Sequence, residues 1–349
     1  MRCGGHTRIN ETICRKAGKG KMNLLSTKFS IIAVMTCLTL LCHPNRVQAQ
    51  WSVAQHIEAK CENARCDLNG IFFDNKERGW LIGDQGLIRA TLDGGQTWEP
   101  QNASVKTSLS DVYFRNKEEG WLVAGGARIL HTTNGGETWE ALYQLPVSPQ
   151  ARQSEAPELY SLSFPDKKKG WVVGTEGRIL RTDDGGKTWQ PLESGTREEL
   201  VHVRFVNDKT GWVVGGKGTI LFTGDGGRTW EKQRSFTEGH LYHIEARGKD
   251  RAWVVGEKGT ILRTTNGGIT WENITIPARE DLLSVGFKDD KNGWIIGWKG
   301  RILRTGDGGQ TWVEQESGTK ANLYGLFVKK KQIWAVGADG LILQYKEDR

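Results

Sequence analysis

The chain of 349 residues lacks the common signatures of enzymes and of nucleic-acid-binding proteins. It contains no phosphate-binding loop, no nucleophile elbow and no cysteine or histidine spacing typical of zinc sites. It also lacks excess charge beyond residue 49, because residues 1–49 hold eight of the 48 basic and one of the 41 acidic residues. The pI of 9.0 therefore reflects this leader, and we expect no nucleic-acid partner.

No apolar run is long enough to cross a membrane as a helix. The longest run, "FSIIAVMTCLTLLC" at 29–42, follows a lysine-rich segment and precedes Val47 and Ala49, which suit a signal-peptidase site. We predict a secretory signal peptide over residues 1–49, with Met22 as an alternative start and an uncleaved anchor as the alternative fate. The protein is then secreted across the inner membrane into the periplasm, or into the thylakoid lumen if the host is photosynthetic.

Cysteine is scarce beyond residue 49. Only Cys61 and Cys66 remain there. Two cysteines this close in an exported protein predict a local disulfide. No second pair or histidine cluster lies nearby in the sequence, so metal binding is the less favoured alternative.

Tryptophan, by contrast, is abundant and periodic. A Gly-Trp-like step recurs at residues 80, 121, 171, 212, 253, 294 and 334, with an apolar strand pattern before it and "VG-x-x-G-x-IL-x-T" after it. About 40 residues with four short strands per unit are typical of a propeller blade. The sequence therefore predicts an all-β fold, a seven-bladed β-propeller with four antiparallel strands per blade.

The repeats predict how the ring closes. Seven units have the inner-strand pattern, but only six have the Gly-Gly-x-Thr-Trp segment that leads into an outer strand. The segment beginning at Trp51 resembles these outer strands, so we predict that residues 51–56 complete the last blade and leave no open edge. The domains are then the leader and one propeller over 50–349, with blades at 67–102, 108–144, 158–193, 199–234, 240–275, 281–316 and 321–346.

A carboxylate or amide residue recurs in the turn before each outer strand. The pattern T-x-[DN]-G-G-x-T-W has this residue at Asp93, Asn134, Asp184, Asp225, Asn266 and Asp307. Asn replaces Asp twice, which a turn acceptor tolerates and a proton-transfer residue does not. The pair Asp183–Asp184 occurs in one blade only. We interpret these residues as structural and expect no catalytic residue.

The turn pattern resembles the Asp-box, or bacterial neuraminidase (BNR) repeat. The full 41-residue unit "GW-x-VG-x-x-G-x-IL-x-T-[DN]-GG-x-TW" resembles more specifically the photosystem II assembly and stability factors of cyanobacteria and chloroplasts. The resemblance covers residues 51–349. It implies an exported, non-enzymatic propeller without cofactors that binds newly made membrane-protein subunits, such as photosystem II reaction-centre proteins.

Two alternative functions remain open. One is an Asp-box carbohydrate-active enzyme, a sialidase-like protein or another glycosidase, although the Arg-Ile-Pro motif usual in sialidases is absent. The other is a generic periplasmic scaffold unrelated to photosynthesis. For the protein-binding function we expect a monomer. Peripheral association with a membrane is a further option.

Departures from the repeat mark the candidate sites. His202 and His243 occupy one inner-strand position in adjacent blades, with Asp111 at the same level, and are weak candidates for a metal or pH-sensing role. On the face of the second-to-third strand turns, the partner-binding candidates are Lys217, Lys258, Lys299, Trp298, Arg178 and Arg301. The Pro-containing loop 144–159 lies on the same predicted face.

Overall fold

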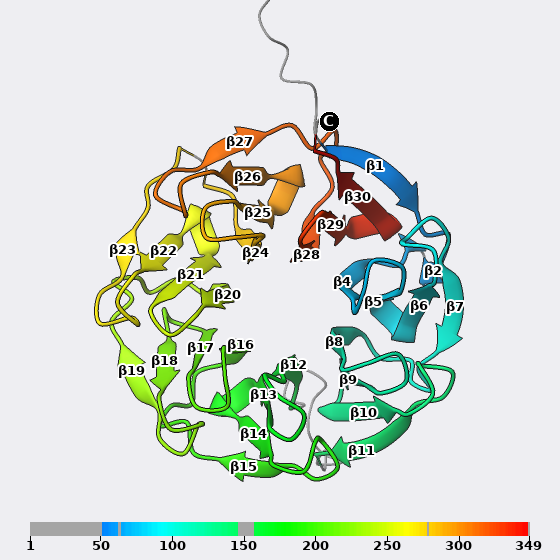
Figure 1. The fold of residues 1–349 in the computed structure, drawn as a ribbon, viewed down its shortest axis with the longest axis horizontal. Coiled ribbons are helices and arrows are strands. Elements are labelled where there is room, and N and C mark those ends of the chain that lie inside the picture. The colour runs from blue at the N-terminus through cyan, green and yellow to red at the C-terminus, as the bar shows by residue number, and fades with distance from the viewer. Residues whose placement is uncertain (1–50, 62–63, 146–156, 278, 348–349) are drawn as a thin grey trace, which may run out of the picture. The chain divides into compact units, whose positions relative to one another are not determined.

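The computed structural model describes residues 51–61, 64–145, 157–277 and 279–347. All of them fall in one compact unit, a ring of seven four-stranded antiparallel sheets around a central axis (Figure 1). The predicted seven-bladed β-propeller is confirmed. Within these ranges, no helix combines the length and the apolar character needed to cross a lipid bilayer.

The strands of each blade occupy four positions from the axis outward. The innermost strands of blades 1 to 7 are β4 (Leu68–Phe73), β8 (Leu109–Phe114), β12 (Leu159–Ser163), β16 (Leu200–Phe205), β20 (Leu241–Arg247), β24 (Leu282–Phe287) and β28 (Leu323–Lys329). The second strands are β5 (Gly79–Gly83), β9 (Gly120–Ala124), β13 (Gly170–Gly174), β17 (Gly211–Gly215), β21 (Arg251–Gly256), β25 (Gly293–Gly297) and β29 (Gln332–Gly337).

The third strands carry the Ile-Leu pattern of the repeat. They are β6 (Leu87–Thr91), β10 (Arg128–Thr132), β14 (Ile179–Thr182), β18 (Ile220–Thr223), β22 (Ile261–Thr264), β26 (Ile302–Thr305) and β30 (Leu341–Tyr345). The outer strands are β7 (Glu99–Asn102), β11 (Glu140–Gln144), β15 (Gln190–Leu192), β19 (Glu231–Gln233), β23 (Glu272–Asn273), β27 (Val313–Gln315) and, for blade 7, β1 (Trp51–His56).

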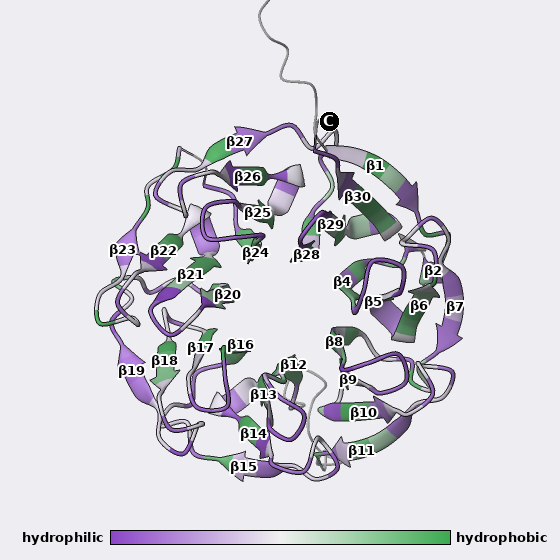
Figure 2. Cartoon of the chain, in the orientation of Figure 1, coloured by the Kyte–Doolittle hydropathy of each residue, from purple (hydrophilic) through white to green (hydrophobic). Residues whose placement is uncertain are grey.

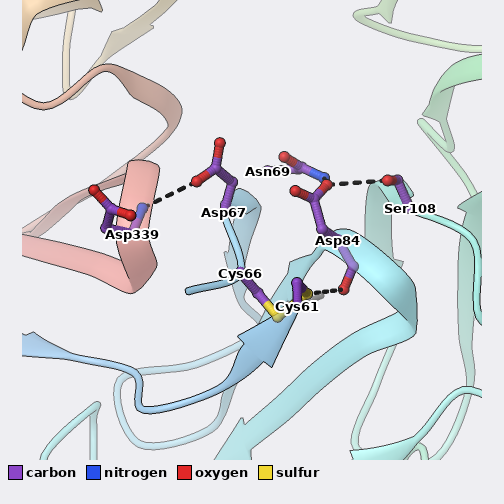
Figure 3. Close-up of a disulfide and its surroundings, with 7 residues drawn as sticks. All are labelled: Cys61, Cys66, Asp67, Asn69, Asp84, Ser108 and Asp339. Atoms are coloured by element: carbon purple, nitrogen blue, oxygen red, sulfur yellow. Dashed lines mark hydrogen bonds between the residues drawn. A yellow bond between two sulfur atoms is a disulfide. The ribbon is translucent and has the colours of Figure 1, made fainter. Parts of the chain in front are cut away.

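Short elements join these strands. Single 3-10 turns link the second and third strands at η1 (Asp84–Gly86), η3 (Thr175–Gly177), η4 (Glu257–Gly259), η5 (Trp298–Gly300) and η6 (Ala338–Gly340). A small hairpin of β2 (Lys60–Cys61) and β3 (Ala64–Arg65) precedes blade 1. A disulfide between Cys61 and Cys66 closes this hairpin, with a Cα–Cα distance of 4.9 Å (Figure 3).

The two ends of the propeller meet in blade 7, as the repeat count predicts. Strand β1 pairs with β30, and Trp51 lies opposite Tyr345 in the register. Figure 1 shows the blue β1 beside the dark red β30. This pairing completes the seventh sheet and leaves the ring without an unfinished blade.

Tryptophan side chains on the second strands join neighbouring blades. Trp80 stacks on Phe114 of the next blade with 3.4 Å between ring centroids, and Trp171 stacks on Phe205 at 3.6 Å. The same kind of contact closes the ring between Trp334 and Phe73, at 5.8 Å. The second strands are buried along nearly their whole length, whereas outer strands such as β7 and β19 are mainly hydrophilic (Figure 2). The core is thus a set of inter-blade layers, and both end faces of the ring are available for binding.

Candidate functional site

The propeller has two end faces made of different turns. On one face, the Asp-box turn packs beside the first-to-second strand turn of its own blade, as the bond from Gly185 N to Lys168 O (2.7 Å) shows. On the other, the second-to-third strand turn packs beside the connection between blades, as the bond from Trp298 N to Asp281 O (3.0 Å) shows. We call these the Asp-box face and the loop face. Their composition matches the arrangement predicted from the repeat.

The Asp-box residues are used within their own turns. In the Asp225 turn, the N–H and hydroxyl of Thr229 donate to the carboxylate at 3.0 and 2.7 Å, and they lower the pKa of Asp225 to about 2. Asn134 makes corresponding bonds, accepting from Thr138 N at 3.0 Å and donating to the Thr138 hydroxyl at 2.9 Å. Because an amide serves as well as a carboxylate, these six residues are turn acceptors. Asp183 instead pairs with Arg181.

The two candidate histidines meet at the axis, with their ring centroids 3.8 Å apart. Polar side chains beside this histidine pair accept hydrogen bonds from backbone N–H groups on the inner strand of the next blade. Asp111 accepts from Leu162 N at 2.9 Å, and His202 Nδ1 accepts from Ile244 N at 3.5 Å. The inner edge of a blade has unpaired backbone groups, and these side chains satisfy some of them.

Burial gives the axial groups unusual titration. It lowers the pKa of His202 well below its ordinary value and that of His243 to about 3, while it raises the pKa of Asp111 to about 6. Both imidazoles are therefore neutral at pH 7. Among the described residues, no cluster of three or more His, Cys, Asp or Glu side chains is arranged to hold a metal ion. The geometry favours an inter-blade structural role for the pair over the metal role considered from the sequence.

The three candidate lysines occupy equivalent places on the loop face. Lys217, Lys258 and Lys299 have φ values of 48, 54 and 56°, a left-handed conformation that the tight turn requires. Acceptors on the following blade fix two of these turns, because Asp281 accepts from Lys258 N at 2.9 Å and Asn322 accepts from Lys299 N at 3.0 Å. The side chains are exposed, as is Trp298 at 44% of its full area.

Glutamates that the sequence reasoning missed offset much of this basic charge. Lys217 pairs with Glu198 at 3.0 Å, and Glu280 lies 3.9 Å from Lys299 and 2.9 Å from Arg301. A signal for them exists in the sequence, since both glutamates precede their lysine by 19 residues. At the same spacing before Lys258 stands a glycine.

The two remaining basic candidates on this face also differ in whether a carboxylate neutralises them. Arg178 lies 3.5 Å from Glu176. The side chain of Lys258 has no ion-pair partner in the described part of the chain. The basic surface without a neutralising carboxylate is therefore smaller than the predicted arc.

The loop-face end of the axial cavity is acidic and aromatic, a feature that the sequence reasoning also missed. Tyr160, Tyr242 and Tyr324 line a cavity of about 340 Å³ there. Burial raises the pKa of Tyr242 to about 12, and the nearby carboxylates of Asp281 and Glu257 contribute to this rise. The loop face therefore holds carboxylates close to Tyr242 as well as the candidate lysines.

Comparison with known proteins identifies the family. A family model described as photosynthesis system II assembly factor YCF48 matches residues 44–156, 150–204, 189–280 and 264–348. The chain belongs to this family. No curated protein matches its sequence.

Solved structures of the YCF48 family have the same fold. The chain is 24% identical to "YCF48 bound to D1 peptide", with a TM-score of 0.69 and coverage of 86% of this chain and 96% of that one. It is 23% identical to YCF48 from Cyanidioschyzon merolae, with a TM-score of 0.67 and coverage of 85% and 98%. A virginiamycin B lyase from Staphylococcus aureus is 19% identical, with a TM-score of 0.68 and coverage of 85% and 100%. At these identities the similarity shows the fold alone.

Only part of the loop predicted between blades 2 and 3 falls within the described residues. Within 144–159, residues 146–156 lie outside the described residues. The candidate surface of this YCF48-family propeller therefore consists of the 3-10 turns and the connections between its other blades.

Proposed function

We propose that this protein is an exported, non-catalytic assembly factor that binds newly made photosystem II reaction-centre subunits, D1 among them. The observation that carries the proposal is the family match, which extends over nearly the whole described propeller. The similarity to the structure of YCF48 bound to D1 peptide supports the choice of partner. The disulfide is consistent with an oxidising compartment, and we propose the thylakoid lumen, or the periplasm, as the location.

The loop face is the proposed docking surface. A rigid ring fixes the backbone of its turns, and the acceptors Asp281 and Asn322 hold the turns of Lys258 and Lys299. Trp298 supplies an exposed aromatic side chain of the kind that commonly anchors protein interfaces. We expect the lysines to contribute more to the association rate and to its salt dependence than to affinity.

Affinity capture from membranes of the native host tests this surface. The test variant combines Lys217→Ala, Lys258→Ala, Lys299→Ala and Trp298→Ala. We expect recovery of D1-containing subcomplexes to fall by on the order of tenfold, since the Trp298 anchor alone is worth about 1–2 kcal/mol and the lysines act mainly on the association rate. Equal recovery with the wild-type protein would show that the loop face is not the docking surface.

A matched control removes the same number of positive charges from the Asp-box face. Lys167→Ala, Lys168→Ala and Lys209→Ala, combined with Ile269→Ala, also delete three exposed lysines and one exposed apolar side chain. This variant should capture partners as the wild type does. Recovery of no photosystem II subunit by any of the proteins would overturn the assembly function itself.

Export and the absence of catalysis have separate tests. N-terminal sequencing of the mature protein should begin at Gln50 if residues 1–49 are a cleaved leader. Fluorogenic sialoside and glycoside substrates should be hydrolysed no faster with the protein than in buffer. Measurable turnover would restore the carbohydrate-active alternative.

A further inference from the structure

One turn between blades carries a bulky residue where its sister turns carry glycine. In three of the connections between an outer strand and the next inner strand, the same turn runs from a buried serine to a threonine. The three turns are Ser194-Gly195-Thr196, Ser235-Phe236-Thr237 and Ser317-Gly318-Thr319. Each serine hydroxyl donates to the threonine carbonyl oxygen, at 3.1, 3.3 and 3.1 Å respectively. The connection after blade 4 therefore has the turn of its sisters, with a phenylalanine in the glycine position.

The backbone at this position favours glycine. The φ values of Gly195, Phe236 and Gly318 are 77, 60 and 74°, in the left-handed region that residues with a Cβ rarely adopt. A bulky residue there costs conformational energy, and strain of this kind is concentrated at functional positions. The fold does not require the phenylalanine, because glycine forms the same turn twice elsewhere in the ring.

The ring of Phe236 projects away from the propeller. It is 66% exposed, and a Cβ added at Gly195 or Gly318 would meet no atom within 4 Å. The phenyl ring thus adds nothing to the core, and its contact with water is unfavourable. A partner that covers this ring would remove that cost.

The residue two positions before the phenylalanine changes with it. The sister turns have Glu193 and Glu316 at this place, whereas the connection after blade 4 has Arg234. The guanidinium carbon of Arg234 lies 4.3 Å from the ring centroid of Phe236. Arg234 has no ion-pair partner in the part of the chain that the structure describes. The turn therefore presents an aromatic ring and a cation together, and both residue types are enriched at protein interfaces.

The turn of Phe236 belongs to the loop face. Gly218, in the second-to-third strand turn of blade 4, donates its N–H to Gly239 O at 2.8 Å. A Cβ added at Gly218 would lie 1.9 Å from Thr237 O, so the two turns are in direct contact. Lys217 and the Phe236 turn thus form one continuous part of this face.

We propose that Phe236 is an anchor residue that inserts into an apolar pocket of a protein partner, while a carboxylate at the rim of that pocket pairs with Arg234. Burial of the ring supplies affinity, and the charge-assisted hydrogen bonds of the guanidinium fix the orientation. The proposal rests on the proposed function in that the partner docks on the loop face. It adds an anchor between blades 4 and 5 to that of Trp298 in blade 6.

The neighbouring charges favour a protein over an anionic lipid surface. Glu198 lies 3.0 Å from Lys217, and the exposed Glu238 follows two residues after Phe236. A lipid surface would bring its anionic headgroups close to both carboxylates, which is unfavourable. A protein can instead place one carboxylate opposite Arg234 and none opposite the glutamates.

The direct test replaces Phe236 by the glycine of its sister turns and measures binding of the purified protein to washed membranes of the native host. Phe236→Gly should raise the apparent Kd by about tenfold, as the loss of an interface anchor does. Because glycine is favoured at positive φ, the melting temperature should be equal to that of the wild type or higher. Weaker binding at undiminished stability separates a binding role from a structural one, and equal binding would overturn the proposal.

Two matched variants locate the effect. Leu92→Gly also replaces an exposed apolar residue by the glycine of sister blades, Gly224 and Gly306, but on the Asp-box face. It should bind membranes as the wild type does, and a loss equal to that of Phe236→Gly would refute the assignment to this turn. Arg234→Gln should weaken binding by about threefold and reduce its salt dependence. An unchanged salt dependence would refute the ion pair.

The other possible occupants give different results. Vesicles of phosphatidylglycerol and phosphatidylcholine should bind neither the wild type nor Phe236→Gly. Binding of the wild type alone would show a lipid surface as the guest and overturn the proposal. A wild type that sediments as a dimer and a Phe236→Gly variant that sediments as a monomer would show a second copy as the guest, which also overturns it.

Immunodetection of D1 in the captured material separates this proposal from the proposed function. Weaker membrane binding of Phe236→Gly, together with less captured D1, supports both. Weaker membrane binding with no photosystem II subunit captured by either protein keeps the anchor and overturns the assembly function.

Discussion

The closure of the ring by Trp51 leads to a quantitative prediction. Trp51 begins β1 and is 2% exposed, with its ring 5.4 Å from that of Tyr345 in an edge arrangement. Its Nε1 donates to Gln315 Oε1 of blade 6 at 3.1 Å. Trp51→Ala therefore removes a large buried aromatic group and a hydrogen bond at the point where the first and last strands of the propeller meet.

The expected cost follows from these contacts. Replacing a buried aromatic side chain by Ala usually destabilises a protein by about 3–5 kcal/mol, and a lost hydrogen bond adds about 1 kcal/mol. Since β1 is held by one neighbouring strand, part of the cost appears as detachment of β1. We expect Trp51→Ala to lower the free energy of unfolding by about 3 kcal/mol at least.

Urea denaturation followed by tryptophan fluorescence and circular dichroism measures this loss. Val53→Ala is the matched control, because Val53 lies on the same strand and is 47% exposed. It should change the free energy of unfolding by less than about 0.5 kcal/mol. If the two variants lose the same stability, or neither loses any, then the closure by β1 does not stabilise the ring and our reasoning is wrong.

Three other predictions concern smaller features. Asp184→Ala should cost about 2 kcal/mol in urea denaturation and Asp184→Asn less than about 0.5, because the turn needs an acceptor oxygen and not a charge; equal costs would contradict this. Burial lowers the pKa of His243 to about 3, so unfolding takes up a proton below about pH 6.5 and stability falls as the pH drops. His243→Ser should reduce that fall by roughly 2 kcal/mol between pH 7.5 and 4.5, while Asp111, whose pKa is raised to about 6, contributes the opposite slope in both proteins; an identical pH dependence would refute it. Replacing Cys61 and Cys66 by Ser should lower stability by about 2 kcal/mol, the value for a short closed loop, and reductant should then have no further effect on thermal unfolding.

The repeat made the fold predictable from the sequence. Each blade carries its own strand and turn residues, and Trp51 supplied the missing outer strand. The Asp-box residues were also interpretable without coordinates, since Asn134 in place of Asp excludes a shared catalytic charge. Local chemistry and periodicity decide these features, because every blade solves the same packing problem.

The candidate sites depended on contacts between blades. The partner of Lys217 is Glu198, on the connection that precedes its blade, and the His202–His243 contact forms only when two inner strands meet at the axis. By itself, the sequence determined the seven-bladed ring, its closure and its family, since these follow from repeated local patterns. Only the tertiary structure decided which charges are neutralised and which inner-strand side chains meet at the axis, because both depend on neighbours that lie far apart along the chain.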